Sequence, residues 1–102
     1  MNIYIIDKMK LEQAAKKLAE LGHPTRLGIY RVLVKAGESG LPVSSIQEHL
    51  KTPSSTLSHH IARLIHVGLI NQVREGRVLR CFAQYKELNE LISYLSDECC
   101  IN

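Results

Sequence analysis

The sequence predicts a mainly α-helical fold with one β-hairpin, in the order α-α-α-α-β-β-α. Apolar residues recur at helical spacing along most of the 102 residues, and a hydrophobic content of 45% is enough for one core. Two β-rich runs, Leu69–Arg74 and Arg77–Ala83, flank Glu75-Gly76, a pair suited to a tight hairpin turn. A helix with a clear start signal directly precedes them. This combination is typical of a winged helix-turn-helix, expected here as a single domain over residues 1–102.

The first expected helix runs from about Lys8 to Leu21 and ends at Gly22. Its small alanines beside leucines permit close approach of another helix, so it suits a dimer interface as well as an internal core. Residues 1–7, which hold a short Ile/Tyr run, are expected either to fray or to pack on a partner chain. The apolar stripe of this helix consists of Leu11, Ala14, Ala15, Leu18 and Leu21.

The second expected helix has Pro24 at its first position and continues to about Ala36. Apolar residues lie almost all round it, so it is expected to be the buried central helix. The segment Gly37–Gly40 is expected to be a loop.

A short third helix and the longer fourth one form a helix-turn-helix, because only a brief turn separates them. The third helix is expected to begin with a capping box, with Ser44 at the cap and Gln47 three residues on. In the fourth helix we expect Thr52 to be the cap and Pro53 to be the first residue. Gly68 ends it, since glycine adopts the left-handed conformation without a steric cost.

The fourth helix has two contrasting faces. Its apolar stripe is formed by Leu57, Ile61, Leu64 and Ile65. The opposite side carries short hydrogen-bonding groups, imidazole and guanidinium, and no carboxylate: Ser55, Thr56, His59, Ala62, Arg63 and His66. A helix that meets only water would mix Glu with Lys. This face therefore predicts an anionic partner with readable edges, which is double-stranded DNA.

The expected DNA contacts form two groups. Arg74 and Arg77 of the hairpin are expected on phosphate or in the minor groove. His60 lies nearer the apolar side of its helix, and it either joins the DNA face or hydrogen-bonds within the fold. The side chains expected to face the major groove are Ser54, Ser55, Thr56, Ser58, His59, His60 and Arg63.

Charge is distributed unevenly along the chain. The formal net charge is +3, but residues 51–80 carry +4 (five Lys/Arg against one Glu) and residues 81–102 carry −3 (one Lys against four Asp/Glu). One surface is therefore expected to meet a polyanion. The sequence contains no signal peptide, no apolar run that could span a bilayer and no disulfide framework among its three cysteines. A cytoplasmic protein without a membrane partner is expected.

The last expected helix runs from Tyr85 to about Glu98. Like the first helix, it lies outside the minimal DNA-binding unit, so the two helices are expected to form a homodimer interface. An inverted-repeat operator, with half-sites about one helical turn apart, is the corresponding DNA site. The apolar stripe of this last helix consists of Leu88, Leu91, Ile92, Leu95 and Cys99.

Three separated segments resemble the ArsR/SmtB family in order and spacing. They are Gly22–Leu27 before the second helix, Ser55–Ile61 in the DNA-facing helix, and Arg74–Arg77 in the hairpin. The resemblance covers roughly residues 10–100. It implies a dimeric bacterial repressor whose winged helix-turn-helix leaves DNA when an inducer, often a metal or metalloid, binds. No cofactor is expected to be required.

The expected inducer depends on the cysteines. Cys99-Cys100 is similar to the adjacent pair at the end of this helix in arsenite-responsive members, and arsenite or antimonite prefers thiolate ligands. Those members carry a third cysteine a few residues further on, which this sequence lacks, so Cys81 or a small cellular thiol would complete the set. Thiol oxidation is the competing signal. Zinc is not expected, because the cysteines and Asp/His pairs that the family uses for it are absent.

Two other classes of function compete with a DNA-binding regulator. Catalysis finds no support, because the sequence has no Gly-rich phosphate loop, no paired carboxylates in an apolar setting and no justified Cys/His dyad. The remaining alternative is a winged helix that only docks on proteins, or a regulator without a small-molecule effector. Salt-sensitive binding to promoter DNA distinguishes DNA binding from docking.

Overall fold

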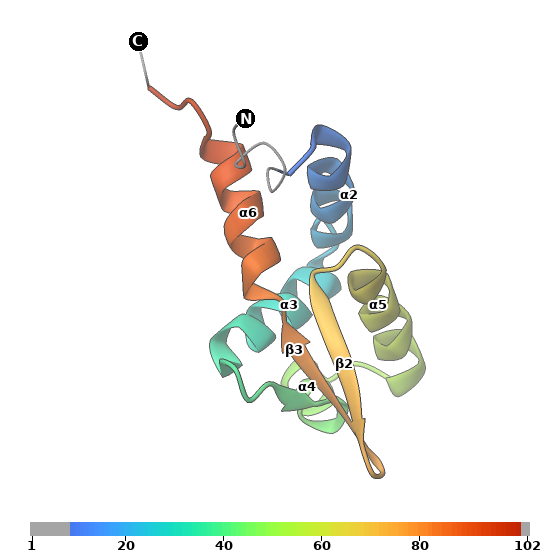
Figure 1. The fold of residues 1–102 in the computed structure, drawn as a ribbon. Coiled ribbons are helices and arrows are strands. Elements are labelled where there is room, and N and C mark those ends of the chain that lie inside the picture. Colours follow the sequence, from blue (N-terminus) through green and yellow to red (C-terminus); the bar gives the residue numbers. More distant parts are fainter. Residues whose placement is uncertain (1–8, 101–102) are drawn as a thin grey trace.

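The helices and strands follow the predicted order, with one additional strand. The computed structural model describes residues 9–100, and over this range the chain forms five helices and a three-stranded antiparallel sheet (Figure 1). The elements are α2 (Leu11–Leu21), α3 (Pro24–Ala36), β1 (Leu41–Pro42), α4 (Val43–Leu50), α5 (Ser54–His66), β2 (Ile70–Glu75), β3 (Val78–Ala83) and α6 (Tyr85–Ser96). The predicted behaviour of residues 1–7 lies outside the described residues. Among the described helices, none has the length and apolar character needed to cross a membrane.

The main core lies between α3, α4, α5 and the sheet. Ile29 and Leu33 of α3 are fully buried and belong to one apolar cluster with Leu57 and Leu64 of α5. Burial of each such side chain stabilises the fold by about 1.5–3 kcal/mol, so this cluster determines where α5 lies. The prediction that α3 is the central helix is confirmed. Its apolar surface is not buried all round, however, because Leu27 is 45% exposed.

The additional strand, β1, pairs with β3 in the sheet order β1-β3-β2, with Leu41 opposite Cys81. The sequence pattern did not indicate this strand, because it is two residues long and Pro42 has no N–H for the ladder. Gly40 permits the close approach of the two strands. It has a φ of +64°, and a Cβ at this position would collide with the carbonyl oxygen of Cys81.

The start of α4 differs from the predicted capping box. The helix begins at Val43, with Pro42 in the cap position and no side-chain cap hydrogen bond, so Ser44 is not its cap. Pairing of β1 with β3 keeps Pro42 extended, with a ψ of 152°. The helix therefore begins immediately after the strand ends.

The start of α5 also differs from the prediction, whereas its end is confirmed. The helix begins at Ser54, so the extended Pro53 is the cap residue and not the first helical residue. The hydroxyl of Thr52 donates to the carbonyl oxygen of Leu50 (3.2 Å) instead of capping α5. Gly68, with a φ of +80°, ends the helical region in the left-handed conformation as expected.

The hairpin turn lies one residue later than predicted. Glu75 pairs with Val78, which leaves Gly76 and Arg77 as a two-residue loop. Gly76 has a φ of +64°, the conformation that the first central position of a primed turn requires. The loop therefore places Arg77 at the tip of the hairpin.

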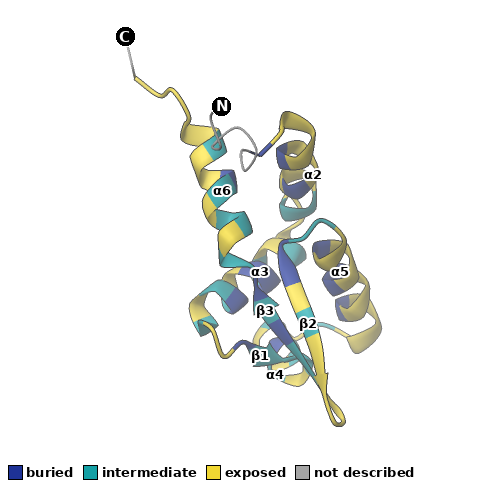
Figure 2. Cartoon of the chain, in the orientation of Figure 1, coloured by how far each residue is buried: buried dark blue, intermediate teal, exposed yellow. Residues whose placement is uncertain are grey.

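The outer helices α2 and α6 share a second, small cluster made by Met9, Ala14 and Leu91. Leu21 and Leu88 of the predicted stripes are half-buried against the core clusters, whereas much of the remaining stripe surface is exposed among residues 9–100 (Figure 2). Helix α6 ends at Ser96, two residues before the predicted end, so Cys99 does not lie on its stripe. The apolar residues left uncovered, each between 41% and 68% exposed, are Leu11, Leu18, Ile92 and Leu95.

Candidate nucleic-acid interface

Helix α5 presents the predicted polar face to solvent (Figure 2). Leu57, Ile61 and Leu64 are at most 2% exposed, and their burial holds the other side of the helix outward. The outward side chains are hydrogen-bonding groups with no negative charge: Ser54, Ser55, Thr56, Ser58, His59 and Arg63. A surface of this kind can donate to and accept from the edges of bases.

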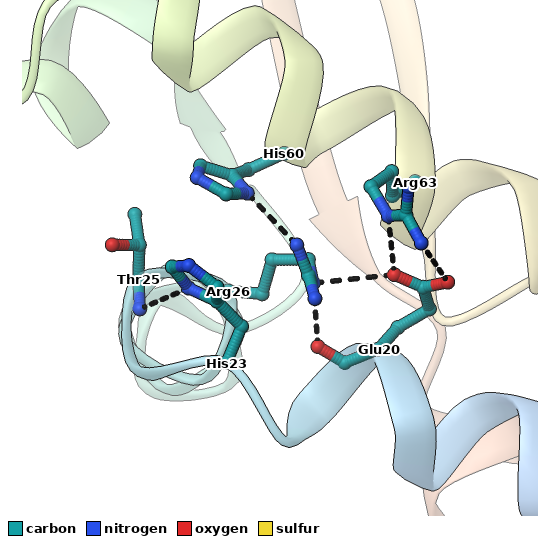
Figure 3. A network of polar contacts seen from close by, with 6 residues as sticks. All are labelled: Glu20, His23, Thr25, Arg26, His60 and Arg63. Atoms are coloured by element: carbon teal, nitrogen blue, oxygen red, sulfur yellow. Dashed lines mark hydrogen bonds and ion pairs between the residues drawn. The ribbon is translucent and has the colours of Figure 1, made fainter.

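A carboxylate from another helix reaches this face. Glu20, in the last turn of α2, accepts two hydrogen bonds from Arg63: Nε to Oε1 at 2.7 Å and Nη2 to Oε2 at 3.1 Å (Figure 3). The hydrogen bonds from Arg63 hold the pKa of Glu20 below its usual value, so the carboxylate is charged at neutral pH. Sequence reasoning missed this partner because Glu20 and Arg63 are 43 residues apart.

Arg26 holds Glu20 from the opposite side. Its Nε lies 3.2 Å from Oε1 of Glu20 and donates to the main-chain oxygen of the same residue at 2.6 Å. Its Nη1 donates to Nδ1 of His60 at 3.1 Å. The side chains of Arg26 and Glu20 are only 12% and 14% exposed, so this network is largely enclosed, whereas Arg63 is 47% exposed.

His60 belongs to the interior of the fold, which removes it from the predicted set of DNA contacts. It is 7% exposed, accepts the hydrogen bond from Arg26, and lies with its ring centroid 4.6 Å from that of His23. Of the two alternatives for this residue, the internal hydrogen bond is therefore the one that the structure contains. Burial lowers the pKa of His60, and the nearby cationic groups lower it further.

His23 has a structural role that the sequence analysis did not find. Its Nδ1 accepts a hydrogen bond from the main-chain N–H of Thr25 at 3.1 Å, and this caps α3. Histidine is not among the preferred capping residues, so only Pro24 signalled the start of α3. The imidazole also covers one side of His60.

The hairpin carries two exposed arginines next to the start of α4. Arg74 and Arg77 line a shallow cavity of about 350 Å³ together with Ser44 and neighbouring apolar residues. Arg80 lies on the same hairpin, but it donates to Glu75 (3.0 Å) and to the main-chain oxygen of Ser39 (3.1 Å). Arg74 and Arg77 are thus the wing residues best placed to meet an external anion.

A buried lysine connects the end of α5 to both outer helices. Lys17 of α2 is 7% exposed, and its Nζ donates to the main-chain oxygen of Val67 at 2.8 Å. The same Nζ lies 3.3 Å from Oε1 of Glu87 in α6. The sequence pattern gave no sign of this role, because a lysine on an amphipathic helix usually faces water.

The three cysteines lie in two different environments. Cys81 is fully buried in β3, and burial raises the pKa of its thiol. Cys99 and Cys100 are exposed beyond the end of α6, with their Sγ atoms 3.2 Å apart. Within residues 9–100, no three His, Cys, Asp or Glu side chains lie close enough to hold a metal ion. Cys81 therefore does not complete a three-thiolate set with the terminal pair in this chain.

Comparison with known proteins gives matches of sequence and of fold. A family model described as a helix-turn-helix domain matches residues 21–73. An uncharacterized HTH-type transcriptional regulator from Methanocaldococcus jannaschii is 37% identical over 67 residues, which are 66% of this chain and 73% of that protein.

Two solved structures share the architecture over most of its length. An ArsR-like transcriptional regulator from Rhodococcus sp. RHA1 is 28% identical, with a TM-score of 0.72, over 83% of this chain and 77% of that one. The second structure is the homodimeric winged helix-turn-helix DNA-binding domain of a possible ArsR-family transcriptional regulator from Mycobacterium bovis. It is 25% identical, with a TM-score of 0.67, over 86% of this chain and 82% of that one.

Proposed function

Because this chain belongs to the ArsR-type winged helix-turn-helix transcriptional regulators, we propose that it is a dimeric, cytoplasmic repressor that binds an inverted-repeat operator and is not an enzyme. The observation that carries the proposal is the outward face of α5, which carries hydroxyl, imidazole and guanidinium groups and no carboxylate of its own. Arg74 and Arg77 extend this surface along the hairpin. The repressor acts by occupying promoter DNA as one domain per subunit.

The two groups of side chains have different tasks in this proposal. Ser55 and His59 contact base edges in the major groove and determine sequence preference. Arg74 and Arg77 contact phosphate and supply affinity that depends on salt but not on sequence. The remaining contacts in the major groove come from Ser54, Ser58, Thr56 and Arg63.

Dimerisation through α2 and α6 gives the operator its symmetry. The apolar residues Leu18 and Leu95 are 41% and 59% exposed among residues 9–100, and they suit the same surface of a second copy. A two-fold axis between the subunits relates the two α5 helices, so each helix meets one half-site.

Selection from a randomised DNA library, followed by binding titrations at several salt concentrations, tests this function. The expected result is an inverted repeat bound by a dimer, with affinity that falls steeply as salt rises. A Ser55→Ala or His59→Ala variant is expected to accept more sequences than the wild type. Binding that is absent, or that does not respond to salt, contradicts the proposal and favours a protein-docking winged helix.

We further propose that the terminal thiols receive the inducing signal. Cys99 and Cys100 are exposed, and their sulfur atoms lie within 3.2 Å of one another, a geometry that suits a shared arsenite or antimonite ion or an oxidation event. The third arsenite ligand would be a small thiol, because Cys81 is enclosed in the core. No cofactor is needed for DNA binding itself.

Release of operator DNA, titrated separately with arsenite, zinc and a mild oxidant, tests the thiol proposal. We expect arsenite or the oxidant to release DNA from the wild type and to leave the Cys99→Ser/Cys100→Ser variant bound. Zinc serves as the comparison ion and is expected to have no effect on either protein. If wild type and variant respond alike to all three reagents, these cysteines do not receive the signal.

A further inference from the structure

The pairing of Arg63 with Glu20 leaves a defined edge of the guanidinium available. An arginine has five N–H donors in one plane, and the two bonds to Glu20 use the Nε donor and one Nη2 donor. The donors that remain are both hydrogens of Nη1 and the second hydrogen of Nη2. They lie along the outer edge of the group, and the 47% exposure of Arg63 indicates that this side chain is open to solvent.

Glu20 is itself held in place, and this fixes the orientation of Arg63. Arg26 contacts both the carboxylate and the main-chain oxygen of Glu20, and its other end is tied to His60. As Figure 3 shows, the carboxylate lies between the two guanidinium groups. A carboxylate in the last turn of a helix is disfavoured by the helix dipole, so the two arginines and not α2 itself account for its position.

The pair also changes what Arg63 can bind. The carboxylate offsets part of the positive charge at Arg63, although Arg26 shares the same carboxylate, and this weakens the attraction of Arg63 to a phosphate. A guanine edge carries two neutral acceptors, O6 and N7, that match two parallel N–H donors. Arg63 therefore has a lower affinity for the DNA backbone, and its free N–H donors still match the acceptors of a guanine edge.

We propose that Glu20 is a positioning residue for DNA recognition: it holds Arg63 so that the guanidinium contacts a guanine edge and not a phosphate. This inference rests on the proposed function, because it assigns a role within the same α5 interface. A carboxylate that only ties α2 to α5 would form the same pair, so the test must separate specificity from stability.

The experiment compares wild type with Glu20→Gln, which keeps the side-chain shape and removes the charge. The DNA probes are the duplex selected by the wild type, the same duplex with each guanine replaced in turn, and a scrambled duplex. In the variant, preference for guanine at one position per half-site is expected to fall about tenfold. Affinity for the scrambled duplex is expected to rise severalfold, and the slope of log K against log salt to steepen by about 0.9 per protomer.

Two further variants serve as controls. Glu12→Gln makes the same charge change at an exposed position of the same helix, and guanine preference is expected to be unchanged. Arg63→Met removes the guanidinium and is expected to lose the same guanine preference, with no further loss when Glu20→Gln is added. Thermal melting of each variant reports whether the fold is intact, and guanine preference that survives in Arg63→Met overturns the inference even if Glu20→Gln does not fold.

Three results would overturn the inference. Equal loss of affinity for the selected and scrambled duplexes in Glu20→Gln would show that the pair is only a structural link. Guanine preference that survives in Arg63→Met would show that Arg63 does not contact a base. Guanine preference and salt slope that Glu20→Gln leaves unaltered would show that Glu20 does not position Arg63. A wild type that binds no duplex would instead contradict the proposed function, and this outcome is distinguishable because it concerns the wild type alone.

Discussion

At the scale of single residues, His60 shows how the surroundings of a side chain determine its state. Burial is the largest cause of its lowered pKa, and His23, Arg26, His59 and Arg63 each add to the effect. Arg26 is always a donor, so the bond at 3.1 Å requires an unprotonated Nδ1 on His60. A proton on this nitrogen would remove the bond and bring two cations together.

This arrangement predicts a pH dependence of stability. The pKa of His60 is below 6.5 in the folded protein, so the unfolded chain binds the proton first as the pH falls. The contribution of His60 is therefore complete above about 6.5 and is lost as the pH falls towards the folded value. Urea unfolding between pH 7.5 and about 5 is expected to show a free energy of unfolding that decreases more in the wild type than in His60→Gln. Equal pH dependence in the two proteins would contradict this prediction.

The residues also mark the limit of what the sequence could predict. The outward face of α5 followed from periodicity, because a helix with a buried stripe has only one other side. Glu20 did not follow, since its bond to Arg63 depends on how α2 lies against α5 and not on any local pattern. The sequence allowed His60 either to join the DNA face or to hydrogen-bond within the fold, and the position of Arg26 produces the internal hydrogen bond.

At the scale of elements, the arginines of the hairpin differ in whether they already have hydrogen-bond partners. Arg77 occupies the turn and faces solvent, whereas Arg80 is bound to Glu75 and to Ser39. An arginine that is already paired contributes less to a new contact, because the existing hydrogen bonds must be given up first.

The two arginines are therefore expected to behave differently in DNA binding. In Arg77→Ala, affinity for all duplexes should fall, and the slope of log K against log salt should become shallower by about 0.9 per protomer. Arg80→Ala should change the slope by less and should lower the stability of the hairpin instead. Salt titrations of both variants, with circular dichroism melting, measure the two effects. A larger change of slope in Arg80→Ala would contradict the assignment.

Element boundaries were predictable where glycine or proline acts locally, and less so where the sheet intervenes. Pro24 and Gly68 mark their helix ends as expected, because each constrains its own backbone. Strand β1 and the start of α4 depend on a pairing with β3, about 40 residues away in the chain, which no local pattern encodes. Helix α6 ends early, and this separates Cys99 from the stripe to which its spacing assigned it.

At the scale of the whole molecule, the exposed apolar surface of the outer helices is the basis of the proposed dimer interface. Leu91 is 3% exposed and packs within the chain, so it is not the residue that a partner would contact. Ile92 and Leu95, at 54% and 59% exposure, are the exposed members of the same stripe. This distinction decides which substitutions separate dimerisation from folding.

The variant Ile92→Glu/Leu95→Glu is expected to be a folded monomer with much weaker operator binding, because two charges per subunit would face each other across the interface. Val73→Glu places a charge at another exposed apolar position, on β2, and should remain a dimer. Analytical ultracentrifugation measures the mass, and circular dichroism verifies that the helices are intact. A double variant that still sediments as a dimer would show that the interface lies elsewhere.

The buried ammonium of Lys17 has a consequence for how a signal crosses the molecule. Lys17 belongs to α2, and its Nζ contacts both Val67, in the segment after α5, and Glu87 of α6. A displacement of α6 would therefore reach the segment after α5 through two polar bonds. Because the main core also holds α5, the DNA-binding unit would move with the outer helices as one body. In a dimer that pairs through α2 and α6, a small angular change at the two-fold axis would then alter the distance between the two α5 helices.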